Sequence, residues 1–136
     1  MAIPNGAGGY QVGDGNLNEV RLGYMPTPAT ATVTATLTVA QTTAGILLGS
    51  PGTSAASYTL PTVADLEATV SSAKVGSTFD LSVVNVDGSS SGVITLVAGT
   101  GWTIVGLATV AATAGTAQLF RARKTGDGTW TLYRIA

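Results

Sequence analysis

The chain has 136 residues, a net charge of −1, and neither cysteine nor histidine. A chain of this length fits one domain with its own core. The missing residue types exclude a disulfide framework, a thiolate metal site and a histidine general base, and the composition therefore argues against an enzyme. Only 10% of the residues are charged, against about 25% in an ordinary domain. Mean hydropathy is +0.38. Small apolar residues raise this value by themselves, but the balance favours a domain that buries surface against other subunits.

Neither nucleic acid nor a membrane is indicated as a partner. The pI is about 5.0, so no basic excess is available to bind phosphates. The longest apolar stretch, residues 92–114, is interrupted by glycines and threonines, and it falls short of the roughly 18 apolar residues that a membrane span needs. The start of the chain lacks the basic and apolar regions of a signal peptide, so we expect no processing there.

Residues 1–29 are predicted to form an extended, glycine-rich arm. The segment shows neither helical nor strand periodicity, and it cannot bury enough apolar surface to fold alone. Apolar side chains are nevertheless spaced along it, and five of them are candidate partner-binding residues: Tyr10, Val12, Leu17, Leu22 and Tyr24. A segment that orders on a partner has this pattern. An irregular terminus packed on its own domain would have the same composition, and the sequence does not separate the two.

From residue 30 onward the patterns are those of a β-rich domain. Residues 29–40 alternate threonine with alanine, valine or leucine, and this period of two predicts a half-buried strand. Two shorter strands are predicted over 45–49 and 57–60. A single short helix is predicted over 62–70, because Val63, Leu66 and Val70 share one stripe. Pro61 and Thr62 are typical of a helix start, and Lys74 and Gly76 are typical of a helix end.

The rest of the chain again predicts strands, over residues 77–85, 93–97, 102–105, 117–124 and 129–135. The last two strands form a hairpin through Asp127 and Gly128, because Asp-Gly readily supplies a residue with positive φ. The predicted fold is therefore mostly β: a small β-sandwich or barrel-like domain over 30–136, with one short helix, behind an arm over 1–29.

No motif for catalysis, cofactor binding or metal binding is found. The seven carboxylates are scattered, and Asp65 and Glu67 stand two apart on a helix, so they point in different directions. The basic residues are skewed, since four of the six lie in the C-terminal hairpin: Arg121, Arg123, Lys124 and Arg134. With the nearby aromatic residues they could grip nucleic acid or glycan. Four charges make a weak electrostatic footprint, so we favour solvated or salt-bridged positions that protect a sheet edge.

Several stretches resemble known proteins. The opening residues resemble those of small virion proteins of tailed bacteriophages, and later segments are similar to phage head-decoration (cement) and head-fibre domains. The stretches that carry the likeness are residues 1–19, 60–62, 76–81, 84–85, 101–103 and 128–133. These stretches mark turns and strands and contain no chemical motif, so the resemblance implies no catalytic residue.

The resemblance implies a structural virion protein on the capsid exterior. It would be a β-rich homo-oligomer, commonly a trimer, that binds the major capsid protein and stabilises the shell. The absence of a distal receptor-like domain argues for cement over fibre. The alternative is a tail-fibre or head-fibre component that binds a host glycan, for which Tyr58, Trp102, Trp130 and Tyr133 would have to be exposed together. The sequence leaves the oligomer symmetry and the position on the capsid lattice undetermined.

Overall fold

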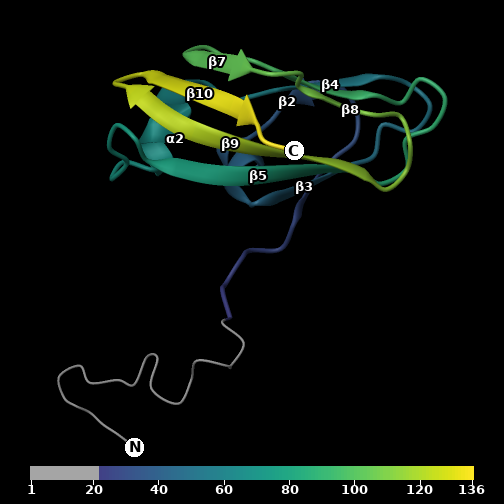
Figure 1. Cartoon of the computed structure of the whole chain (residues 1–136), viewed down its shortest axis with the longest axis horizontal. Coiled ribbons are helices and arrows are strands. Elements are labelled where there is room, and N and C mark those ends of the chain that lie inside the picture. Colours follow the sequence, from purple (N-terminus) through teal and green to yellow (C-terminus); the bar gives the residue numbers. More distant parts are fainter. Residues whose placement is uncertain (1–21) are drawn as a thin grey trace, which may run out of the picture.

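The computed structural model describes residues 22–136, which form a mostly β domain of two sheets with two short helices (Figure 1). The predicted mostly β, sandwich-like class is confirmed. Residues 22–28 lead into the first strand without forming a helix or strand themselves. The predicted arm lies mainly in residues 1–21, outside the described residues. Its extended character and the domain boundary at residue 29 therefore stay predictions.

The strands divide into a six-stranded and a four-stranded sheet. The larger sheet has the order β1 (Ala29–Ala31), β3 (Ile46–Gly49), β5 (Thr78–Asn85), β9 (Thr116–Gly126), β10 (Thr129–Arg134) and β7 (Trp102–Val105). The smaller sheet has the order β2 (Ala35–Thr36), β4 (Ala56–Thr59), β6 (Ile94–Val97) and β8 (Thr109–Val110). The two-residue strand β8 has no counterpart in the sequence prediction.

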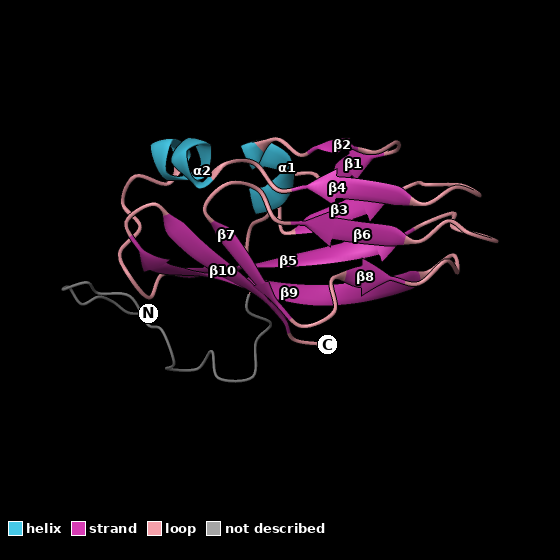
Figure 2. Ribbon diagram, turned by 90° about the horizontal axis from the view of Figure 1, so that it is seen from above, coloured by secondary structure: helices cyan, strands magenta, loops and turns pink. Residues whose placement is uncertain are grey.

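The first six strands pass alternately from one sheet to the other, and neighbours within each sheet are parallel. Ala29 pairs with Leu47, and Leu47 pairs with Val83, so residues far apart in sequence form one row. Figure 2 shows these strands stacked as β1/β2, β3/β4 and β5/β6. The remaining strands close the sheets with antiparallel partners, apart from β7, which runs parallel to β10.

The single strand predicted over residues 29–40 is wrong. The chain forms β1, turns, forms β2 and then enters a helix, α1 (Val39–Thr43). Thr38 is the N-cap of α1, because its hydroxyl accepts from the Gln41 N–H while its own N–H donates to the Gln41 side chain. This capping box satisfies two backbone N–H groups at the start of the helix. The described residues therefore contain two helices instead of the one predicted.

The other predicted helix is confirmed as α2 (Val63–Thr69), with Thr62 as its N-cap. It ends at Val70, before the predicted stop at Lys74 and Gly76. The C-terminal hairpin is also present. Gly128 has a φ of +74°, and the pairing register shifts between Thr129 and Trp130, as in hairpins closed by a glycine bulge.

The core lies between the two sheets and under α2. Side chains from the inner faces fill it, including Leu47, Tyr58, Leu81, Val83, Ile94, Leu96, Phe120 and Leu132. At Gly49 the two sheets approach closely, since a Cβ there would collide with Ile94 and Tyr58. The buried Asn85 donates to the carbonyls of Gly92 and Ala111 at 2.8 and 3.0 Å. It thereby holds two loops at the end of β5.

Candidate interaction surface

Three of the four aromatic residues considered for glycan contact lie in the core. Tyr58 is fully buried, and Trp102 and Trp130 are 7% and 2% exposed. The Trp102 ring N–H donates to the Pro61 carbonyl at 2.8 Å, and the two indole rings pack at 6.0 Å. Only Tyr133 is partly exposed. The four rings therefore do not form an exposed stacking platform.

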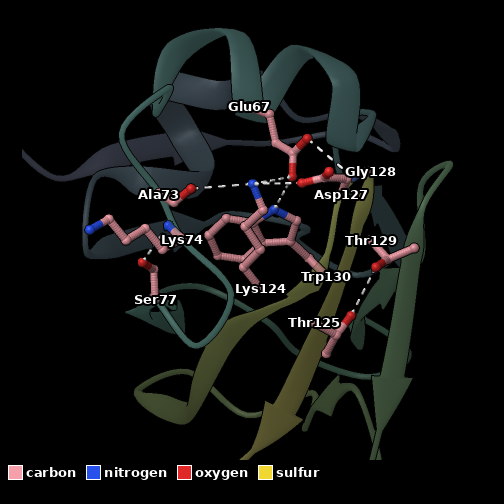
Figure 3. Close-up of polar contacts among 10 residues, drawn as sticks. All are labelled: Glu67, Ala73, Lys74, Ser77, Lys124, Thr125, Asp127, Gly128, Thr129 and Trp130. Atoms are coloured by element: carbon pink, nitrogen blue, oxygen red, sulfur yellow. Dashed lines mark hydrogen bonds and ion pairs between the residues drawn. The ribbon is translucent and has the colours of Figure 1, made fainter.

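A polar cluster connects α2 to the β9–β10 hairpin (Figure 3). The Lys124 ammonium lies 3.0 Å from a Glu67 carboxylate oxygen and donates to the Ala73 carbonyl. The Trp130 ring N–H and the Gly128 backbone N–H donate to the same carboxylate, each at 3.2 Å. The hydrogen bond from Lys124, assisted by those from Trp130 and Gly128, lowers the pKa of Glu67. The carboxylate is thus held ionised and occupied, which suits a structural tie between helix and hairpin.

The basic side chains of the hairpin do not gather into one patch. Lys124 points inward to Glu67, whereas Arg121 and Arg123 lie on the outer face of the larger sheet. Arg121 forms a bidentate pair with Asp80 at 2.7 and 3.1 Å. This hydrogen bonding lowers the pKa of Asp80 and raises that of Arg121. The salt-bridged interpretation fits Arg121 and Lys124, and the charge left for an external anion is small.

The outer face of the six-stranded sheet carries a group of aliphatic and aromatic side chains, here called the apolar face. Its members alternate with the core residues of the same strands and are partly or largely exposed: Ile46, Leu48, Val84, Val105, Leu119, Tyr133 and Ile135. The register brings them together. Leu48 pairs with Val84, and the Ile135 N–H donates to the Leu119 carbonyl. The face also holds polar side chains, since Ser82 lies between Ile46 and Leu119, and Asp80 and Arg121 share a row with Tyr133 and Val105.

The outer face of the four-stranded sheet has a different chemistry and is here called the hydroxyl face. Its outward positions are Thr36, Ser57, Thr59, Thr95 and Thr109, with Val97 as an aliphatic neighbour. Thr95 lies at its centre, paired with Ser57 on one side and Thr109 on the other. Hydroxyl groups bond water readily, so this face is suited to solvent.

The described part of the candidate partner-binding arm is exposed. Leu22 and Tyr24 are 89% and 98% exposed, while Met25 lies against Gly45 at the start of β3. Whether Leu22 and Tyr24 bind a partner stays a prediction. Tyr10, Val12 and Leu17 lie outside the described residues, and their role stays a prediction.

No protein-family model, curated protein or solved structure matches this chain. Within residues 22–136, no group of three or more acidic, histidine or cysteine side chains could hold a metal ion. In the same part of the chain, no helix is long and apolar enough to cross a membrane. The surface must therefore be interpreted from its own geometry.

Sequence reasoning missed the apolar face, although a signal for it exists. Residues 45–49 and the Val83–Val84 pair place apolar side chains at consecutive positions of a strand. Because successive residues point to opposite faces, such runs make both faces apolar. Residue type alone did not reveal which strands would lie side by side.

Proposed function

We propose that this chain is a structural virion protein that decorates and stabilises the capsid shell of a tailed bacteriophage. It binds the major capsid protein as a homo-oligomer. The resemblance of several segments to phage head-decoration proteins supports this proposal. The observation that carries it is the exposure of Leu22 and Tyr24, at 89% and 98%. Burial of such side chains by a partner removes apolar surface from water, which favours binding.

Attachment is expected to rest on apolar burial and backbone pairing. Full burial of one large apolar side chain contributes about 1.5–3 kcal/mol. Residues 22–28 form no strand of their own and can therefore add to an exposed sheet edge on the shell. Ion pairs are a smaller source, because Arg121 and Lys124 are already engaged within the chain.

Glycan binding by a fibre component gains no support from the described surface. Tyr58, Trp102 and Trp130 are buried, and the ring N–H groups of both tryptophans already have acceptors. A sugar-stacking platform needs exposed ring faces. Decoration of a shell requires no such platform.

Binding to isolated shells tests the proposal directly. The full chain and a variant lacking residues 1–24 would each be sedimented with purified capsid shells, and occupancy would be measured. We expect the full chain to decorate the shells and the truncated chain to lose most binding, while its far-ultraviolet circular dichroism is unchanged. Absence of binding by the full chain contradicts the proposal, and full occupancy by the truncated chain contradicts the role of the arm.

Salt dependence identifies the forces at the contact. The screening length falls from about 10 Å at 0.1 M to about 3 Å at 1 M salt, so exposed ion pairs weaken steeply while apolar contacts persist. We expect shell binding to survive 1 M sodium chloride and to fail when Tyr10 and Leu17 are both changed to alanine. Loss of most binding by half-molar salt, with that double variant unaffected, would assign the contact to Arg121 and Arg123.

A further inference from the structure

Two apolar features of this chain are largely exposed among the described residues. One is the apolar face, and the other is segment 22–25, in which Leu22 and Tyr24 are exposed while Met25 lies partly against Gly45. In Figure 1 the described residues before β1, 22–28, extend away from the sheets. Tyr24 is 98% exposed, so the segment does not fold back onto the face of its own domain. Each feature is of the kind that could cover the other.

The dimensions of the two features are compatible. The apolar face spans five neighbouring strands, about 4.8 Å apart, and three rows of outward residues, about 6.8 Å apart, which gives roughly 20 Å by 14 Å. An extended segment of four residues is roughly 13 Å long and lies within that width. Tyr24 alone can bury about 150–250 Å². A subunit that donates one segment and accepts another buries area of the order of the 800 Å² per partner found in stable interfaces.

The charges are also compatible with a second copy. Segment 22–25 has no charged side chain. Asp80 and Arg121, in one row of the face, neutralise each other in a bidentate pair. Arg123 is exposed in the next row, beside Thr78 and Thr131. An uncharged segment that packs over Leu48, Leu119 and Ile135 lies on the other side of the Asp80–Arg121 row from Arg123, so it buries no unpaired ion, which would be costly. A strongly acidic or basic partner would gain little there.

We propose that segment 22–25 of one copy packs across the apolar face of a second copy. The contact rests on the proposed function and deepens it, because it names the surface through which the decorating oligomer forms. Leu22 and Tyr24 then cover a neighbouring copy, and attachment to the shell falls to the earlier candidates Tyr10, Val12 and Leu17. Donor and acceptor are different patches, so the contact is heterologous and repeats from copy to copy until a ring closes. The face contributes mainly Leu48, Leu119 and Ile135, and the segment contributes Leu22 and Tyr24.

Disulfide trapping tests this contact, because the chain has no cysteine of its own. One chain would carry Tyr24→Cys, and a second, size-tagged chain would carry Leu119→Cys. The two would be mixed, oxidised mildly and run on a non-reducing gel. We expect a covalent heterodimer in more than half of the material. A matched pair of Tyr24→Cys with Thr95→Cys, at the centre of the hydroxyl face, should give less than a tenth of that yield.

Two outcomes of trapping would overturn the proposal. Equal yields from Leu119→Cys and Thr95→Cys would show random collision. A chain carrying both Tyr24→Cys and Leu119→Cys that closes only within itself would show that the segment covers its own domain.

Light scattering supplies an independent measurement. At about 50 μM the unmodified chain should have a mass above the 13.5 kDa of one copy, and Leu119→Asp should weaken the association at least tenfold. Because Leu119→Asp can disturb the sheet, the double variant Leu22→Ser with Tyr24→Ser serves as a second probe outside the folded core. It should weaken association equally and leave the unfolding midpoint unchanged. A single-copy mass for the unmodified chain, or unaltered association in the double variant, overturns the proposal.

The two proposals fail in different ways. If trapping fails while shells are still decorated, the copy-to-copy contact is wrong and the proposed function stands. If trapping succeeds and no shell binds, the assembly is real and the shell is not its partner.

Discussion

The two sheets differ most on the faces that they turn away from each other. The inner faces of both are apolar and buried, as a shared core requires. Outside, the four-stranded sheet presents the hydroxyl face, whereas the six-stranded sheet presents the apolar face. The difference originates in the strands themselves. In β6 the pair Thr95–Leu96 alternates polar with apolar, whereas in β3 Ile46, Leu47 and Leu48 are apolar on both sides.

This contrast shows how to interpret a sandwich with unequal faces. A strand that alternates polar and apolar residues needs cover only on its apolar side, because the polar side chains on the other side bond water. A strand that is apolar on both sides is ordinarily covered on both sides. The partly exposed Ile46 and Leu48 of β3, with Val84 beside Leu48, therefore indicate that the folded chain retains association surface after its own core is complete.

The largest effect on stability is expected at an inner position of the six-stranded sheet. Trp130 is 2% exposed, packs on Phe79 and Trp102, and donates to Glu67. Trp130→Ala should lower the free energy of unfolding by about 3–5 kcal/mol. Urea unfolding would measure it. Tyr133→Ala, an outward position on the same strand, is the matched control and should cost less than half as much; equal costs would remove the distinction between the faces.

Two consecutive residues of β3 sharpen the comparison. Gly49→Ala places a methyl group between the sheets, against Ile94 and Tyr58, and should cost about 1–3 kcal/mol by overpacking. Leu48→Thr changes only the outer face. It should cost about 1 kcal/mol or less while weakening association between copies. Thermal unfolding and light scattering separate the two effects, and a larger stability loss for Leu48→Thr would contradict the assignment of faces.

Acid should reveal the tie between α2 and the hairpin. The pKa of Glu67 is lowered in the folded protein by the hydrogen bond from Lys124, relative to an ordinary value of 4.5. More protons are therefore bound by the unfolded chain below about pH 4.5, and the contribution of Glu67 is lost as pH falls through its folded pKa. Urea midpoints at pH 6, 4 and 3 should fall less for Glu67→Gln than for the unmodified chain. Parallel curves would show that Glu67 contributes nothing.

The smallest effect is expected on the hydroxyl face. Thr95→Val keeps the β-branched shape at a partly exposed position and should change the free energy of unfolding by about 0.5 kcal/mol or less. Association between copies should also be unaffected. A rise in association equal to that lost in Leu48→Thr would mean that any apolar outer face suffices, and the specificity of the apolar face would fail.

The local predictions succeeded where one physical signal dominated. Helix α2 followed from its apolar stripe and the Thr62 cap, and the hairpin followed from Asp127 and Gly128. The strand over 29–40 failed because two signals competed. Its alternation satisfied the strand pattern, but Thr38 and Gln41 formed a capping box that the same residues also permit. Of the five candidate arm residues, only Leu22 and Tyr24 can be compared with the structure, since the described residues begin at Leu22.

The sequence by itself determined the class of the fold, most of the strands, one helix and the lack of a His- or Cys-based site, because these depend on residue type and local period. Only the tertiary structure decided the alternating passage between sheets, the inward turn of Lys124 to Glu67, and the grouping of Leu48, Leu119 and Ile135 on one face. Parallel neighbours such as Leu47 and Val83 come from distant segments, and no turn connects them directly. Their pairing depends on the burial of the whole core, and a local pattern does not contain that information.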